Sequence, residues 1–285
     1  MNVLVTGGRG FIGRKLIKKL LKEGHYVISL DRSEEKGTKI LGPQYLSIDL
    51  MLINNISMPS IDVVYHLAAV GVDKVSSFED PSDVFRNNLE VTNEVIKWCI
   101  KNDAKLIYAG SASKFFNVLQ SPYTLYKSMA EDSIRLFQKH YNLKADIATI
   151  YNVYGYCTET ETEISGLIGA WKQQMKKGTL KVYGNGDQVK DFIHVDDVTD
   201  ALCMLLYSEP STENWHIGSD DVYSVNNIFD LFKLNNPKLK KKVTLSSEVD
   251  NSDQKLVNIK FHKTFKWTPK HFLSNYIKNV FKYAD

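Results

Sequence analysis

The sequence is poor in cysteine, which excludes two common ways of stabilising a small domain. Its three cysteines, Cys99, Cys157 and Cys203, are odd in number and far apart, so they offer neither a disulfide framework nor a zinc-ligand spacing. This usage is typical of a reducing compartment, and we expect a cytoplasmic protein. No segment approaches the roughly 18 consecutive apolar residues of a membrane helix. The chain opens on a strand pattern rather than on a charged export signal.

Arginine is also scarce, and it disappears from the second half of the chain. The last of the five arginines is Arg135, so any cationic site beyond it depends on lysine. The net charge of +3 is too small to indicate an anionic partner. The lysine run at 238–242 lacks interleaved aromatic residues, and we interpret it as a solvated loop or helix face. We expect neither a nucleic-acid partner nor a membrane partner.

The first thirteen residues contain a strand, a glycine-rich turn and the start of a helix. An apolar strand pattern at 3–6 runs into Gly7, Gly10 and Gly13, and an apolar helical pattern follows at 11–21. Glycines at this spacing let the chain turn, bring the backbone close to a pyrophosphate and allow helix and strand to pack closely. The helix N-terminus adds unpaired N–H groups. We expect a dinucleotide-binding turn; the alternative is a tight turn of another α/β domain.

An acidic residue at the end of the next strand favours NAD over NADP. The strand pattern at 25–30 ends on Asp31, whose carboxylate can bind the adenosine ribose hydroxyls and would repel a 2′-phosphate. Arg32 stands beside it, and its guanidinium could instead accommodate that phosphate. The expected cofactor is therefore NAD, with NADP as the alternative.

Strand and helix patterns alternate through the first half of the chain. Strands are expected at 44–49, 61–69, 105–111 and 146–155, and helices at 81–101 and 121–140. Such alternation predicts a parallel sheet with helices on both faces. We therefore predict an α/β fold: a Rossmann-type doubly wound parallel sheet over 1–155, to which 187–207 return, and a smaller α/β substrate-binding domain over 156–285.

Tyr123 and Lys127 form the one Tyr-x-x-x-Lys spacing in the chain. On the helix expected at 121–140 they lie on one face. A lysine ammonium near a buried phenol lowers the phenol pKa, so the phenolate can take a proton from a substrate hydroxyl while a hydride leaves the same carbon. Ser111 ends the preceding strand, where its hydroxyl can bind the reacting oxygen. Taken separately, Tyr123 and Lys127 would be interpreted as an exposed pair on a helix, and Ser111 as a turn or helix-capping residue.

The order of the motifs resembles that of the extended short-chain dehydrogenase/reductases. TGGRGFIG at 6–13, HLAA at 66–69, NVYG at 152–155, KDFIHVDD at 190–197 and HIGS at 216–219 follow in that order. The chain is similar to the NAD-dependent epimerase/dehydratase family that works on nucleotide sugars. The resemblance implies a nucleotide-sugar substrate and a homodimer.

The resemblance also implies roles for individual residues. The NAD pyrophosphate would be held by Gly7, Gly10, Phe11, Ile12 and Gly13. The adenosine would meet Asp31, Arg32, Asp49 and Leu50, and the cofactor cleft would be lined by Leu67, Ala68, Ala69 and Asn88. Tyr123 would be the base, assisted by Ser111, and Lys127 would bind the nicotinamide ribose. The substrate would face Ser113, Asn152 and Lys190.

The chain departs from the family pattern where the substrate would bind. Lys190 stands where an arginine is usual, and the segment 249–255 also lacks the usual arginine. Lysine point charges would thus replace bidentate phosphate contacts. Residues 114–116 replace the aromatic–glycine pair that normally follows the catalytic serine, and the loop from Ser111 to Tyr123 is short. We expect a reshaped substrate pocket.

The residues after Ser111 narrow the reaction that the resemblance implies. Ala112 and Ser113 cannot supply the Asp-Glu pair of the 4,6-dehydratases, the acid of the decarboxylases or the cysteine of the 3,5-epimerase-reductases. We predict an NAD-dependent nucleotide-sugar 4-epimerase, similar to those acting on UDP-glucose or UDP-N-acetylglucosamine. The alternatives are an NAD(P)H-dependent nucleotide-4-keto-6-deoxysugar reductase, which the short loop favours, and a non-catalytic NAD-binding protein.

Overall fold

The computed structural model describes residues 1–32, 42–71, 78, 80–156, 166–244, 253, 255 and 259–282. Cys157 and most of the segment 249–255 lie outside the described residues. The chain divides into two compact units, Met1–Thr149 with Thr199–Trp215 and Ile150–Val198 with His216–Asp285. The first unit thus ends at Thr149 rather than at 155, and the segment that returns to it is Thr199–Trp215 rather than 187–207.

The first unit is built on a seven-stranded sheet with the order β10-β6-β5-β4-β1-β2-β3. Its strands are β1 (Asn2–Thr6), β2 (Tyr26–Asp31), β3 (Gln44–Ser47), β4 (Val63–His66), β5 (Lys105–Ser111), β6 (Ala145–Ile150) and β10 (Asn214–Ile217). β1 pairs in parallel with both β2 and β4, so the winding direction reverses at β1. The predicted α/β fold with a doubly wound parallel sheet is confirmed.

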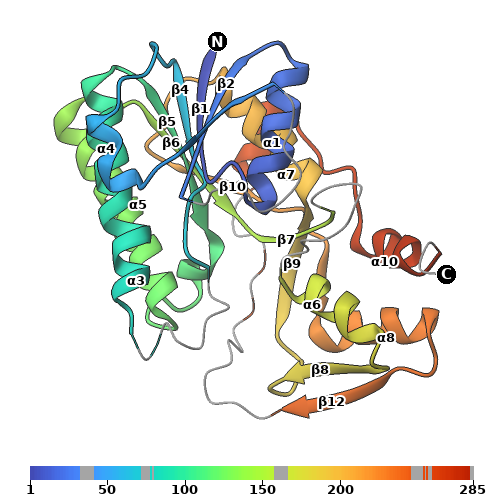
Figure 1. Cartoon of the computed structure of the whole chain (residues 1–285). Coiled ribbons are helices and arrows are strands. Elements are labelled where there is room, and N and C mark those ends of the chain that lie inside the picture. The colour runs from blue at the N-terminus through green and yellow to red at the C-terminus, as the bar shows by residue number, and fades with distance from the viewer. Residues whose placement is uncertain are drawn as a thin grey trace. The chain divides into compact units, whose positions relative to one another are not determined.

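Helices cover both faces of this sheet, with α3, α4 and α5 on one side and α1 and α7 on the other (Figure 1). They are α1 (Phe11–Lys22), α3 (Ser82–Phe85), α4 (Val91–Lys101), α5 (Pro122–Tyr141) and α7 (Val195–Leu206), with short helical turns η1 (Leu50–Asn55), η2 (Arg86–Glu90) and η3 (Ala112–Phe115). In the described part of the chain, no helix is both long and apolar enough to cross a membrane.

α5, which carries the predicted catalytic pair, has clear start and stop signals. The Ser121 hydroxyl accepts a hydrogen bond from the backbone N–H of Thr124 at 3.2 Å, and Pro122 occupies the first turn, where no N–H is needed. The helix ends at Asn142, which adopts the left-handed conformation with φ 54°. Ala130 and Ile134 are fully buried on its inner face. This face holds the helix against the sheet.

The second unit has its own strands and its own core. Its strands are β7 (Asn152–Tyr154), β8 (Thr179–Tyr183), β9 (Val189–His194), β11 (Val222–Ser224) and β12 (Lys240–Thr244), and its helices are α6 (Gly166–Met175), α8 (Val225–Asn235), α9 (Lys260–Phe265) and α10 (Leu273–Lys282). The buried Trp171 ring meets Phe229 and Phe232 edge-on, with ring centroids 6.2 and 5.6 Å away. Such aromatic pairs add to the stabilisation from area burial alone.

Two expectations from the sequence are wrong in this unit. The segment 146–155 is not one strand, because β6 and β7 belong to different sheets with Tyr151 between them. The lysine run at 238–242 is neither loop nor helix, because most of it belongs to β12, which pairs in parallel with β8. Lys241 Nζ lies 4.7 Å from the centre of the Phe229 ring, and its stem covers apolar surface.

Candidate active site

The segments that follow β1, β2, β4 and β5 leave the sheet at the same edge. Thr6 of β1 is level with Leu30 of β2 and with His66 of β4, and His66 is level with Tyr108 of β5. The residues after these positions include the glycine turn, the predicted ribose-binding acid and the predicted catalytic serine. Because the winding reverses at β1, this edge is where ligands bind in open α/β sheets.

The glycine turn depends on three positions that could not carry a side chain without change. Gly7 has φ +70°, and a Cβ there would lie 2.7 Å from the backbone nitrogen of Ala68. A Cβ on Gly13 would lie 2.3 Å from the carbonyl oxygen of Gly7. Gly10 is exposed, and the nearest atom to a Cβ there would be that same oxygen, at 3.1 Å. The turn is thus tightly packed inside and open at Gly10.

The N-terminus of α1 suits the pyrophosphate that the motif predicts. Gly10 is its N-cap, and within the described residues neither a capping side chain nor an acidic residue occupies the first turn. Phe11 and Ile12 are half-buried at the start of the helix. The first N–H groups of the helix therefore retain capacity for an anion, which the helix dipole also favours.

Asp31 lies beside the glycine turn at the end of β2. Its Oδ2 accepts a hydrogen bond from the backbone N–H of Arg9 at 3.2 Å, so the carboxylate is fixed next to the turn. The side chain remains partly exposed, and Arg32 beyond it is exposed. A carboxylate in this place can bind ribose hydroxyls and repels a 2′-phosphate.

Asp49 and Leu50, both predicted to meet the adenine, begin the turn η1. Asp49 Oδ1 accepts from the backbone N–H of Met51 at 3.0 Å, and Oδ2 accepts from Arg86 at 2.7 Å. The hydrogen bond from Arg86 holds the pKa of Asp49 below its ordinary value. Leu50 is buried in the core of the first unit. Asp49 is therefore a fixed anion, whereas the Leu50 side chain serves packing.

A buried polar network holds the segment Leu67–Ala69, which was predicted to line the cofactor cleft. His66 accepts from or donates to the hydroxyls of Thr6 and Thr92, at 2.7 and 3.0 Å. Asn88 accepts from the N–H of Val70 at 2.8 Å and donates to its carbonyl at 3.0 Å. The Asn88 amide thereby fixes the end of the segment, a role that sequence reasoning missed.

The protonation state of His66 follows from its partners. The Thr92 hydroxyl donates to the carbonyl of Asn88, so it accepts from the Nε2–H of His66, and the other ring nitrogen accepts from Thr6. The imidazole is thus neutral, and burial lowers the pKa of His66 to about 3, assisted by the charge of Lys127.

This buried imidazole predicts acid sensitivity of the fold. The folded His66 pKa is depressed, so below its ordinary value the unfolded chain binds a proton that the folded chain does not. His66 alone should therefore cost about 2 kcal/mol of unfolding free energy between about pH 7.5 and about pH 5. Urea titrations at the two pH values should show this loss in the wild type and a smaller loss in His66→Gln. The exposed His140→Gln is the control and should behave like the wild type; an equal loss in His66→Gln would contradict the assignment.

Ser111, Ser113 and Tyr123 lie together at the end of β5. The hydroxyls of Ser111 and Ser113 are 2.9 Å apart. Burial raises the pKa of Tyr123, and a hydrogen bond with Ser111 opposes that rise. The Ser111 hydroxyl is therefore placed where it can favour the phenolate of Tyr123. The expectation that Lys127 also lowers the pKa of this phenol stays a prediction.

Lys127 is almost fully buried and points at the backbone of β5. Its Nζ donates to the carbonyl of Ala109 at 2.5 Å and lies 4.1 Å from the centre of the Tyr108 ring. Burial lowers the pKa of Lys127 to about 8, while the carboxylate of Glu131 opposes the change. Glu131, one turn further along α5, is a further charged residue that sequence reasoning missed. Its spacing of four from Lys127 was the available signal.

The predicted substrate residues Asn152 and Lys190 lie in the second unit, on neighbouring strands. β7 and β9 pair in parallel, with Asn152 level with Phe192. Asn152 Nδ2 donates to the carbonyl of Asp191 at 2.9 Å. Asp191 is fully buried, and its carboxylate accepts from the N–H groups of Ser219 and Asp220, yet burial raises its pKa to about 6. This acid, within the motif at 190–197, anchors the strand that carries Lys190.

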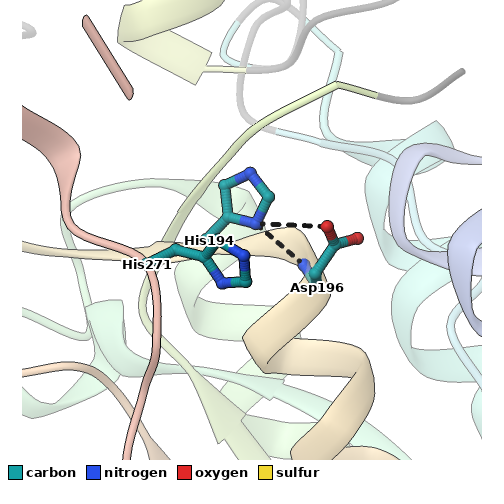
Figure 2. A group of neighbouring side chains, drawn as sticks. All are labelled: His194, Asp196 and His271. Atoms are coloured by element: carbon teal, nitrogen blue, oxygen red, sulfur yellow. Dashed lines mark hydrogen bonds and ion pairs between the residues drawn. The ribbon is translucent and has the colours of Figure 1, made fainter. Parts of the chain in front are cut away.

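A cluster of possible metal ligands also lies in the second unit, formed by His194, Asp196 and His271 (Figure 2). Nδ1 of His194 accepts from the backbone N–H of Asp196 at 3.2 Å. Nδ1 of His271 lies 3.1 Å from Asp197, which also accepts from the backbone N–H of His271 at 3.0 Å. The two imidazoles stack with centroids 4.4 Å apart. The backbone N–H groups of Lys270 and His271 both donate to Asp197 of α7, and these hydrogen bonds hold His271 beside His194.

Known proteins share this architecture and part of this sequence. A protein of Methanocaldococcus jannaschii named "Putative UDP-glucose 4-epimerase" is 30% identical over 253 residues, which cover 81% of each chain. UDP-N-acetyl-alpha-D-glucosaminuronate decarboxylase of Bacillus cytotoxicus is 25% identical, over 92% of this chain and 84% of the relative. UDP-glucuronic acid 4-epimerase of Bacillus cereus, solved with UDP-glucuronic acid and NAD, has the same fold, with a TM-score of 0.84 at 23% identity over 99% of this chain and 98% of that one. The model of the NAD dependent epimerase/dehydratase family matches residues 3–218, and the chain belongs to this family.

Proposed function

We propose that the protein is an NAD-dependent nucleotide-sugar 4-epimerase. The observation that carries the proposal is the group Ser111, Tyr123 and Lys127 at the same sheet edge as the glycine turn. Its hydroxyls and ammonium suit the removal and return of one hydroxyl proton. Relatives in the family support a nucleotide-sugar substrate, including the Methanocaldococcus jannaschii protein named for UDP-glucose.

In the proposed reaction Tyr123 takes the proton of the sugar C4 hydroxyl, and Ser111 hydrogen-bonds the oxygen as it becomes a carbonyl. NAD⁺, when bound, supplies the acceptor for the C4 hydride and the source from which it returns. After the ketosugar turns over, Tyr123 gives the proton back to the oxygen as the opposite face of C4 regains its hydrogen. Lys127 is the residue proposed to bind the nicotinamide ribose. The cycle is balanced because the proton and the hydride are both restored.

The absence of carboxylates after Ser111 favours epimerisation over the other reactions named among the relatives. Ala112 and Ser113 provide neither an acid nor a base at this point of the turn. The carboxylate of Glu131 is fully buried behind the strand and paired with Lys114, so it does not replace them. A reaction that needs proton transfer at a second carbon has fewer groups to use here than one confined to C4.

The carboxylate of Asp31 supports NAD rather than NADP as the cofactor of this reaction. It is fixed by Arg9 N–H beside the turn and would repel a 2′-phosphate. We also propose a homodimer through α3 and α5, because these helices expose apolar residues on the first unit. Phe85 is 37% exposed, Met129 42% and Leu136 54%.

The proposal is tested by incubating the purified protein with UDP-glucose and UDP-N-acetylglucosamine, without added cofactor, and by identifying the dinucleotide released on heating. We expect interconversion with the matching 4-epimer and recovery of NAD. The short turn from Ser111 to Tyr123 favours the reductase as the second candidate. Consumption of NADH or NADPH with a nucleotide-4-keto-6-deoxysugar, without any interconversion, would establish the reductase and refute the epimerase.

A further inference from the structure

Glu131 is a fully buried carboxylate that joins three elements of the first unit. Its Oε2 forms an ion pair with Lys114 of η3 and accepts a hydrogen bond from Asn214 of β10 at 2.8 Å. Arg135, one turn further along α5, lies 3.4 Å from the same oxygen. A buried charge is tolerated only when such partners compensate it. Of the two cations, Lys114 is the more buried: 10% of its side chain is exposed, against 35% for Arg135.

The position of Glu131 relates it to the proposed catalytic residues. Tyr123, Lys127 and Glu131 follow at intervals of four residues, so they share one face of α5. That face lies against β5, where Lys127 donates to the carbonyl of Ala109. A Cβ on the next residue, Gly110, would lie 2.6 Å from Glu131 Oε1. The carboxylate is therefore packed against the strand that leads directly to Ser111.

Lys114 belongs to the turn on the other side of Ser111. η3 begins directly after that serine, and Lys114 reaches back from it to α5. The ion pair thus links η3 to α5 at the end of β5, and Ser111 and Ser113 lie in the short segment between β5 and Lys114. Lys114 lies in the segment 114–116, where the sequence departs from the family pattern that it otherwise resembles.

Among the residues that the structure describes, few charged groups lie around the Lys114–Glu131 ion pair. On α5 itself, Glu131 has Tyr123, Lys127 and Arg135 as neighbours. From other elements it faces Lys114 of η3, the Tyr108 phenol of β5 and the Asn214 amide of β10. The neutral His66 of β4 faces Lys127. The negative charge of Glu131 raises the pKa of both Tyr123 and Lys127. A base that must release its own proton is hindered by such a charge, so a counter-charge favours the phenolate.

We propose that Lys114 is a positioning residue: by pairing with Glu131 it holds the turn of Ser111 and Ser113 against α5 and neutralises the negative charge behind Tyr123 and Lys127. The inference rests on the proposed function, because it assigns Tyr123 the part of the base. It adds a residue that touches neither substrate nor cofactor and acts through Glu131.

The test is the titration of Tyr123 in the NAD-loaded protein, without substrate. The near-ultraviolet phenolate absorbance of each protein is measured against pH, and the curve of the same protein carrying Tyr123→Phe is subtracted. Lys114→Met should move the Tyr123 midpoint upward by about half to one pH unit, because Glu131 loses the more buried of the two cations that pair with it and keeps only Arg135. Glu131→Gln should move it downward by about the same amount, because Lys114 then stands unopposed. The double variant should return to the wild-type midpoint.

The two single variants should shift the Tyr123 midpoint in opposite directions, and the double variant should cancel these shifts. A purely structural role of the ion pair would not give this pattern. The single variants will lose thermal stability, so titrations are made well below each melting temperature. Lys144→Met, which removes an exposed ion pair with Asp103, is the matched control and should leave the midpoint unchanged. Shifts of equal sign in the two single variants, no shift in either, or no cancellation in the double variant would overturn the proposal.

The experiment distinguishes this inference from the proposed function. If the predicted shifts occur but no nucleotide sugar is converted, the charge pairing stands and the epimerase assignment falls. If nucleotide sugars are interconverted but the Tyr123 midpoint is unchanged in both single variants, the epimerase assignment stands and the positioning role of Lys114 is refuted.

Discussion

Replacing Tyr123 by phenylalanine should lower the rate of 4-epimerisation by about 10²- to 10⁴-fold while the purified protein still carries NAD. The substitution keeps the ring at the start of α5 and removes only the hydroxyl that interacts with Ser111. Without it, the site lacks the hydroxyl that is proposed to take the proton of the C4 hydroxyl. The measurement is the initial rate of UDP-sugar interconversion, with the cofactor content determined after heat release.

Tyr126→Phe provides the matched control for this loss. Tyr126 lies three residues further along the same helix, and its ring packs edge-on against Phe85 with centroids 5.3 Å apart. The rate of this variant should stay close to that of the wild type. Undiminished turnover in Tyr123→Phe, or an equal loss in Tyr126→Phe, would show that the base has been assigned to the wrong residue.

The second large effect is expected from Gly7→Ala. At Gly7 an alanine meets two obstacles, the left-handed φ of +70° and a Cβ position 2.7 Å from the backbone of Ala68. The left-handed backbone costs about 1 kcal/mol, and the overlap should add at least about 1 kcal/mol more. Relief of the overlap must displace the glycine turn or the segment beside it. Because a loss of about 1.4 kcal/mol in binding is tenfold in affinity, NAD should be largely lost on purification.

Gly24→Ala is the control that measures the cost of the left-handed backbone conformation alone. Gly24 has φ +82°, but a Cβ there would meet nothing within 4 Å. This variant should lose about 1 kcal/mol of unfolding free energy and keep its NAD. Urea unfolding and the dinucleotide content of both variants check the comparison. If both variants retained NAD equally, the close approach of Ala68 to the turn would not matter for cofactor binding.

The glycine turn and the acidic residue beside it were predictable because their signals are local. The glycine spacing, the strand before it and the helix after it determine the turn, and Asp31 follows from the end of the next strand. Tyr123 and Lys127 were found by their spacing on one helix. The doubly wound sheet followed from alternating apolar runs, since buried parallel strands carry few polar residues.

The remaining features depend on contacts between distant parts of the chain. β7 was merged with β6, because apolar residues recur throughout 146–155 and neither glycine nor proline stands at the change of sheet at Tyr151. β12 was missed because lysines of an edge strand resemble those of a loop. Glu131 was overlooked because its partner Lys114 comes from a different element, and the spacing of four from Lys127 does not by itself reveal that ion pair.

The central claim, that the protein oxidises and reduces the same sugar carbon, is tested most directly by the position of a label. UDP-glucose carrying deuterium at C4 is incubated with the protein and no added cofactor, and the product is examined by NMR. The proposed cycle predicts the 4-epimer with deuterium still at C4, because the hydride returns to the carbon that it left. A 4-epimer with deuterium at another carbon of the sugar, or with the deuterium lost, would contradict the proposed mechanism.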